Sequence, residues 1–190
     1  MNLALKTSLA ISFSWLLVPT LVWAQMADTP EPGSIEAIAQ ETSDPRFSSP
    51  WVASIPESAA IPSPTDFLGH IAGAANELPN SAIIYAYLRK LAQASDRVTI
   101  EVIGQTEENR EILLVAISDA AGIQALPDLK AATARLADPR LTTPAQAEEM
   151  LPWARPFYYF NGAIHADESG ALDMLMELAY RLAVSEDPMI

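Results

Sequence analysis

The sequence holds 190 residues with a formal net charge of −13 and no cysteine, a length that allows one ordinary domain. Its 11 Lys and Arg against 24 acidic residues argue against binding to nucleic acid, because phosphate backbones are bound by clustered positive side chains. The lack of cysteine excludes disulfides, thiol catalysis and thiolate metal ligands. Any metal must therefore be bound by His, carboxylates and water.

Residues 1–24 resemble a secretory signal peptide. A single Lys6 precedes a long apolar stretch that contains Pro19 and ends at Val22-Trp23-Ala24. This pattern favours cleavage before Gln25 over a membrane span, and an uncleaved anchor is the alternative. The sequence thus predicts a secreted or periplasmic protein with no stable membrane span after cleavage.

Residues 25–64 are predicted to form a proline-rich acidic arm or linker. Between Asp28 and Asp66 lie seven prolines and seven acids, with Arg46 as the only basic residue. Such a composition buries too little apolar surface to offset the entropy of ordering. We interpret the segment as a tether or as an arm draped over the surface, with short apolar pieces such as WVASI as candidates for docking.

Residues 65–190 alternate helical and strand patterns in chain order. Helices are predicted over 80–94, 126–137, 144–150 and the final GALDMLMELAYRLAVS, and strands over 97–104, 111–118 and 156–163. The first two strands are joined by a short polar turn, which predicts an antiparallel hairpin. The second of them is a nearly continuous apolar run and is expected to be buried on both faces. This order predicts an α/β sheet covered by helices.

The candidate site lies where the third predicted strand ends. His165 and Glu168 stand there as His-x-x-Glu in FYYFNGAIHADESG, and imidazole and carboxylate are both zinc ligands. Ligand sites gather at the carboxyl ends of strands in α/β sheets, and Gly162 and Gly170 flank the motif and would allow tight turns. The alternative is a helix cap, in which Asp167 or Glu168 accepts hydrogen bonds from first-turn amides.

A second motif makes the pattern more specific. These features follow one another along the chain: GQTEENREILLVAIS, then a polar helical insertion, then FYYFNGAIHADESGA and an amphipathic helix. In this order they resemble the opening of the zinc carboxypeptidase family. That family has a pattern similar to G-x-[ST]-x-E-G-R-x-I before an apolar strand, and G-x-H-x-x-E at the end of a later strand. The resemblance covers about residues 65–190.

The resemblance implies a fold, a cofactor and a reaction. The fold would be part of a three-layer α/β/α mixed sheet, and His165 and Glu168 would be the first two ligands of Zn²⁺. The zinc would activate water to cleave a peptide bond near the carboxyl terminus of a peptide or protein substrate. Arg110 matches an Arg of the turn before the second strand, for which we expect a structural role or that of a solvated turn charge.

Two positions depart from the family pattern. Asn109 stands where the family usually has Gly, and Asn tolerates a left-handed turn better than most residues. Asp167 stands where digestive members have an Arg that helps to hold substrate. A negative charge there would repel a substrate carboxylate, so the side-chain preference of those members does not transfer.

The third zinc ligand and the general base of the family lie far beyond the Glu, and no matching positions occur in this sequence. His70 is the only other histidine, and we expect it to have a surface or packing role rather than to complete the site. The sequence therefore predicts no catalytic residue within this chain, and we interpret it as the amino-terminal portion of a zinc metallocarboxypeptidase. The alternative function is a non-catalytic carboxypeptidase-like α/β domain that binds a peptide or a partner protein.

Overall fold

The structure is a computed structural model, and it describes residues 28–165, 167–188 and 190. The predicted signal peptide, residues 1–24, lies outside the described residues. Within the described part of the chain, no helix is both long and apolar enough to cross a membrane.

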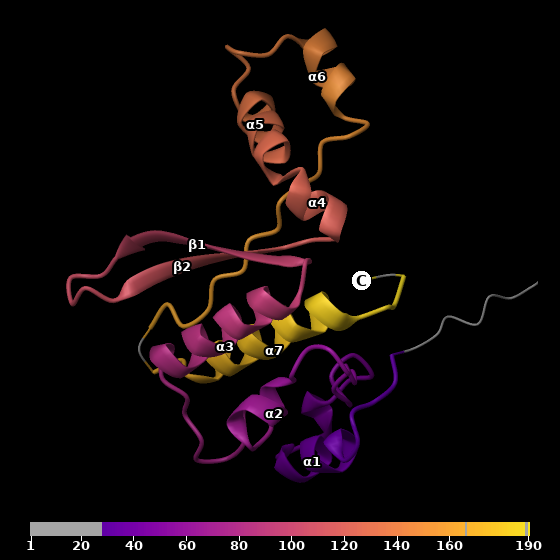
Figure 1. Ribbon diagram of the computed structural model, residues 1–190, viewed down its shortest axis with the longest axis vertical. Coiled ribbons are helices and arrows are strands. Elements are labelled where there is room, and N and C mark those ends of the chain that lie inside the picture. The colour runs from indigo at the N-terminus through magenta and orange to yellow at the C-terminus, as the bar shows by residue number, and fades with distance from the viewer. Residues whose placement is uncertain (1–27, 166, 189) are drawn as a thin grey trace, which may run out of the picture.

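Two helices form the middle of the main body (Figure 1). Helix α3 (Ser81–Ala94) and helix α7 (Gly170–Val184) lie side by side. The hairpin of β1 (Val98–Gln105) and β2 (Glu111–Ile117) packs on one side of this pair. On the opposite side lies the amino-terminal arm, with α1 (Ser34–Glu41), a short 3-10 helix (Pro45–Phe47) and α2 (Pro64–Leu68).

The core forms where α3 and α7 face each other. Its buried residues come from the arm, α3, β1 and α7: Ile55, Ile61, Ile71, Ile84, Tyr87, Leu91, Val98, Met176, Ala179, Tyr180 and Ala183. In α3 the buried positions recur at helical spacing, and the Asn80 side chain caps the helix by accepting from the amides of Ala82 and Ile83. Helix α3 was predicted from these two signals, and the structure confirms it.

The hairpin is antiparallel, as predicted. Its register pairs Val98 with Ile117 and Gln105 with Glu111, with an irregularity between Val102 and Gly104. Asn109 adopts a φ of 60° in the turn, so the left-handed conformation expected of the residue that replaces Gly is confirmed. Burial of β2 on both faces was wrong, because none of its seven residues is fully buried.

The amino-terminal arm contributes to the core through its backbone as well as its side chains. Ile55 is fully buried, and the neighbouring carbonyl of Pro56 accepts a hydrogen bond of 2.7 Å from the Tyr180 hydroxyl. The Pro62 carbonyl accepts from the Tyr87 hydroxyl at 3.1 Å. Tyrosines of α7 and α3 therefore satisfy carbonyls that a proline-rich segment leaves without a partner in a regular ladder.

Residues 119–155 form a separate helical lobe beyond the hairpin (Figure 1). It contains α4 (Ala120–Gln124), α5 (Leu126–Ala137) and α6 (Pro144–Met150). The bounds of α5 and α6 match the prediction, and α6 begins with a capping box between Thr143 and Gln146. Helix α4 was not predicted.

The third predicted strand is wrong. Residues 154–163 have no strand, and the sheet of the described residues contains β1 and β2 alone. The four aromatic residues of this segment are 50% or more exposed: Phe157, Tyr158, Tyr159 and Phe160. An apolar run becomes a strand only where a neighbouring strand offers hydrogen bonds and packing. The chain is thus a mixed α/β protein, and the three-layer arrangement stays a prediction.

Candidate metal centre

His165 and Glu168 lie in a tight turn that leads into α7. The Glu168 amide donates to the His165 carbonyl at 3.2 Å, and the Ala171 amide donates to the Glu168 carbonyl at the same distance. The chain passes from this turn directly into α7 at Gly170. The three-residue spacing therefore brings both side chains to one side of the turn.

The two side chains contact each other. His165 Nδ1 lies 2.8 Å from Glu168 Oε1, and the His165 amide donates to Glu168 Oε2 at 3.2 Å. These hydrogen bonds from His165 hold the pKa of the Glu168 carboxyl below its usual value. Both side chains are accessible, at 72% exposed for His165 and 50% for Glu168. The pair thus offers a nitrogen and an ionised oxygen to the solvent.

This donor set fits part of a zinc site. Two ligands of a tetrahedral zinc with bonds of about 2.0 Å lie about 3.3 Å apart, so the 2.8 Å pair needs only a small separation to accept the ion. Two ligands alone hold zinc weakly, because affinity grows with the number of ligands and their support. Among the described residues no group of three or more His, Asp or Glu converges to hold a metal ion.

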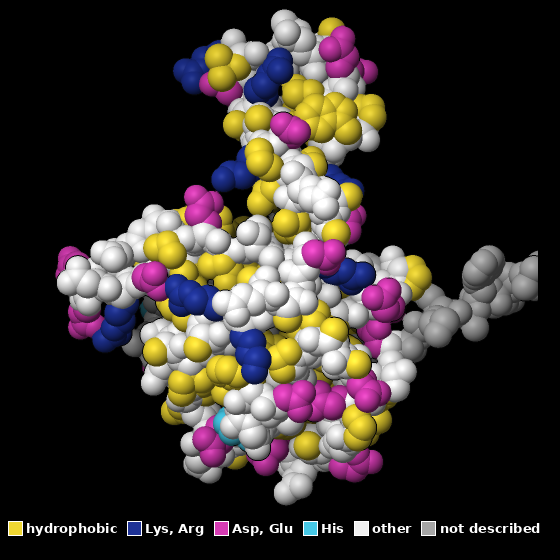
Figure 2. All heavy atoms as spheres, in the orientation of Figure 1, with side chains coloured by type: hydrophobic (Ala, Val, Ile, Leu, Met, Phe, Trp, Pro, Cys, Tyr) yellow, Lys and Arg dark blue, Asp and Glu magenta, His cyan; other side chains and the backbone are white. Residues whose placement is uncertain are grey.

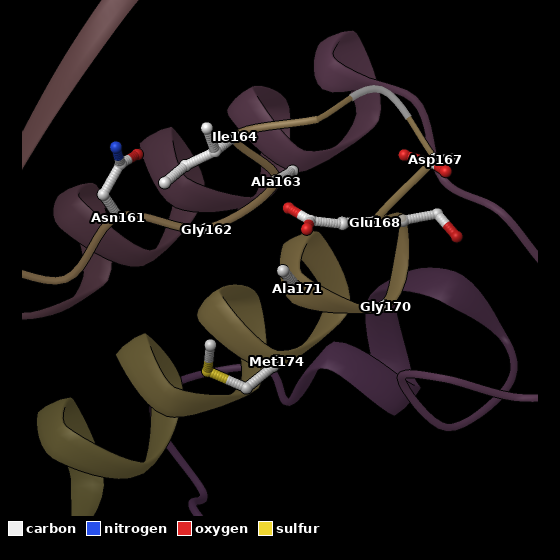
Figure 3. Close-up of a pocket in the computed structure, with 10 residues that line it drawn as sticks. Asn161, Gly162, Ala163, Ile164, Asp167, Glu168, Gly170, Ala171 and Met174 are labelled. Carbon is white, nitrogen blue, oxygen red and sulfur yellow. The ribbon is translucent and has the colours of Figure 1, made fainter.

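A hollow of about 370 Å³ lies beside Glu168 (Figure 3). It is bounded by the segment before the motif, by the turn itself and by the first turns of α7: Asn161, Gly162, Ala163, Ile164, Asp167, Glu168, Ser169, Gly170, Ala171 and Met174. Glu168 is among these residues and His165 is not. The hollow has room for a small group next to the carboxylate.

The backbone before the motif takes a different form from the one expected. Neither Gly162 nor Gly170 has a positive φ, whereas Ala163 has a φ of 55°, a conformation that costs an alanine about 1 kcal/mol. A Cβ on Gly162 would lie 3.0 Å from Ala171 Cβ and 3.0 Å from Leu175 Cδ1. The lack of a side chain at Gly162 therefore allows this segment to pack closely on α7. Gly162 does not form the tight turn that was expected.

The structure gives no support to the helix-cap alternative. The N-cap of α7 is Ser169, which makes no side-chain capping hydrogen bond. The Glu168 carboxylate bonds back to His165 instead of to the first-turn amides. The pair is therefore available as ligands without loss of a helix cap.

His70 lies near Asp173, a residue of the first turn of α7. Its Nδ1 is 3.0 Å from the Ile71 carbonyl oxygen, and its Nε2 is 3.7 Å from a Glu77 carboxylate oxygen. It joins no three-residue ligand group with His165 and Glu168 in the described chain. Arg110 lies in the hairpin turn, where it is paired with Glu108 and 67% exposed, as befits a solvated turn charge.

Asp173 is a buried acid that was not among the predicted site residues. It lies in the first turn of α7, is 4% exposed, and its Oδ1 has no hydrogen-bond partner among the described residues. Desolvation raises the pKa of this carboxyl, and a hydrogen bond from the Gly73 backbone and the nearby His70 partly offset the rise. The sequence did contain a signal for this burial, because Asp173 lies among the regularly spaced apolar residues of the final helix.

The family model described as zinc carboxypeptidase matches residues 84–190, more than half of the chain. The matched range contains most of α3, the hairpin, the lobe, His165, Glu168 and α7. The match confirms the resemblance that the two motifs indicated. No curated protein and no solved structure matches the chain.

Proposed function

Because this chain belongs to the zinc carboxypeptidase family, we propose that it serves zinc-dependent cleavage of peptide bonds near the carboxyl terminus of a peptide or protein. In this proposal His165 and Glu168 are two of the zinc ligands. The observation that carries it is the contact of 2.8 Å between His165 Nδ1 and Glu168 Oε1 within the matched range.

The chain's own residues prepare this site in three ways. The lowered pKa of Glu168 keeps its carboxylate ionised to a lower pH than that of an ordinary Glu, and the ionised form is the one that binds a cation. Close packing at Gly162 fixes the segment before His165 against α7. The exposure of both side chains leaves them open to the metal and to a substrate.

Zinc, when bound, is a Lewis acid that polarises the scissile carbonyl and activates water to attack it. No residue of this sequence matches the family's third ligand or its general base, and among the described residues His70 joins no ligand group with the pair. Asp167 borders the hollow next to Glu168, and its charge disfavours a substrate carboxylate at that point. We therefore assign metal binding to this chain and no catalytic residue.

A second function is favoured by one observation, the lack of a third ligand near the pair among the described residues. A carboxypeptidase-like domain that binds a peptide or a partner protein without cleaving it would need only the scaffold. The two functions differ in whether the chain takes up zinc.

Zinc uptake tests the proposal. We expect the 190-residue chain to bind one zinc in calorimetric titration, and His165→Ala to weaken binding about tenfold or more, since loss of even a supporting contact has an effect of that order.

His70→Ala is the matched control, because it removes the other histidine of the sequence and should leave the affinity for zinc unchanged. Equal loss in both variants, or no uptake at micromolar zinc by the unaltered chain, would contradict the assignment. Peptide binding without zinc uptake would favour the non-catalytic function.

We also propose that the protein is secreted or periplasmic, with residues 1–24 as a signal peptide. The support is the apolar stretch after Lys6 in the sequence. Mass spectrometry of the exported protein should find an amino terminus at Gln25, and retention of Met1 would contradict cleavage.

A further inference from the structure

The helical lobe contains a second, open pocket that the proposed function does not use. Its volume is about 580 Å³, and its lining is largely apolar: Ala121, Gly122, Ala125, Asp128, Leu129, Ala131, Ala132, Arg135, Met150, Trp153 and Arg155. It shares no lining residue with the hollow beside Glu168. Binding sites are typically pockets of about 300–1,000 Å³ with apolar walls and a few polar groups, and this pocket fits that description.

The pocket lining contains two arginines and one acid. Arg155 is paired with Asp119 at 3.0 Å, whereas the Arg135 guanidinium forms no ion pair with any described residue. Asp128 is the only acid in the lining. The whole chain has a net charge of −13, so an acidic ligand would be held here by the Arg135 guanidinium and not by a positive surface.

Hydrophobic side chains gather on the lobe among both basic and acidic side chains (Figure 2). Trp153 is 49% exposed at this pocket, and Met150 is buried in it. Tryptophan, methionine and arginine are enriched where one protein binds another, and tryptophan and arginine dominate the binding energy there. This composition favours a peptide over a small polar ligand.

We propose that the pocket between α4, α5 and α6 binds an acidic peptide segment, with an apolar side chain against Met150 and Trp153 and a side-chain carboxylate on Arg135. The carboxylate complements the unpaired guanidinium, and the apolar side chain removes the exposed face of Trp153 from water. The site is separate from the metal centre, so it does not depend on zinc.

Fluorescence anisotropy with a labelled peptide tests the proposal. The probe is a peptide of alternating Leu and Glu whose ends are acetylated and amidated, so that its only carboxylates are side chains. We expect saturable binding to the full chain, and we expect Arg135→Glu to weaken it about tenfold or more, as for other central arginines of interfaces. His165→Ala should leave it unchanged.

Arg140→Glu is the matched control. Arg140 lies in the same lobe but outside the pocket lining, and it is paired with Asp138 at 2.7 Å. Both variants change the net charge equally, so equal weakening would show non-specific attraction and overturn the proposal. Equal binding of a peptide of alternating Leu and Lys, or no saturable binding of the acidic probe, would overturn it too.

Ala131→Trp provides a test that leaves every charge in place. Ala131 lines the pocket and lies on the exposed face of α5, so a larger side chain fills the pocket without entering the core of the lobe. We expect this variant to lose the acidic probe while its circular dichroism stays unchanged. Undiminished binding by Ala131→Trp would place the peptide elsewhere and overturn the proposal.

Discussion

The two ends of helix α7 differ in how they are held. Towards its carboxyl end Tyr180 is fully buried, and Arg181 donates to the carbonyls of Trp51 and Ser54 at 3.0 and 2.5 Å. At its amino end His165 and Glu168 are largely exposed and bond to each other. One helix thus joins a part of the molecule that is packed to a part that is open.

The carboxyl end of α7 therefore contributes to the stability of the fold, whereas the amino end is the part that can bind a ligand. Burial of apolar surface and satisfied hydrogen bonds stabilise the carboxyl half of α7. An exposed ion pair contributes little to stability, so the amino end can exchange its internal hydrogen bond for a metal at small cost to the fold. Substitutions at the two ends should therefore differ sharply in their effect on unfolding.

The largest effect is expected from Tyr180→Ala. This change removes a fully buried ring and leaves the Pro56 carbonyl without its donor, and we expect the free energy of unfolding to fall by about 3–5 kcal/mol. Tyr158→Ala is the control, since Tyr158 is 85% exposed and its loss should change stability by about 0.5 kcal/mol or less. Urea unfolding measures both, and similar losses would show that the packed end has no special role.

The packed part of the fold was largely predictable from the sequence because its signals are local. Spacing of apolar residues and an Asn cap identified α3, and alternation around a polar turn identified the hairpin. The role of the arm was predictable only in part, since WVASI, which ends at Ile55, was a candidate for docking. Its prolines indicated poor burial, yet Ile55 and Ile61 enter the core, since α3 and α7 supply the hydroxyl donors that its carbonyls need.

A smaller effect is expected from Gly162→Ala at the open end. The new methyl group would meet Ala171 Cβ at 3.0 Å and the Ala171 carbonyl oxygen at 3.2 Å, so the segment must move away from α7. Overpacking of this kind costs about 1–3 kcal/mol. We expect thermal unfolding to show that loss, together with weaker zinc binding as His165 shifts.

Gly170→Ala is the matched control for this change. A Cβ at Gly170 meets nothing within 4 Å, and its φ is not positive. Alanine should therefore keep or slightly raise stability, because it lowers the entropy of the unfolded chain. If both variants lost stability equally, close approach to α7 could not be the reason that position 162 requires a glycine.

The candidate site was predictable as residue types but not as a three-dimensional arrangement. The spacing of His165 and Glu168 predicted a pair of zinc ligands, and the structure places the two side chains 2.8 Å apart. The run before them was wrongly predicted to be a strand, since a strand depends on a partner that local sequence does not reveal. The positive φ of Ala163 had no signal in the sequence, because alanine rarely adopts it.

The smallest effect is expected from Asp173→Asn, where the open end meets the packed one. Burial raises the pKa of Asp173, so its favourable contribution is complete only below the unfolded value of about 3.9 and is lost as the pH rises through the folded value. Asparagine cannot ionise and can still accept from the Gly73 amide. We expect it to stabilise the protein by about 1 kcal/mol at neutral pH and by nothing below about pH 4.

Asp128→Asn distinguishes the effect of burying a carboxylate from the general effect of removing a negative charge from the first turn of a helix. Asp128 also lies in a first turn, that of α5, but it is exposed, so it keeps its hydration and its attraction to the helix dipole. Its replacement should lower stability by about 0.3–1 kcal/mol, opposite in sign to Asp173→Asn. Should Asp173→Asn also destabilise at neutral pH, the buried carboxylate would be held by His70 more strongly than burial opposes it, and the open end of α7 would depend on that contact.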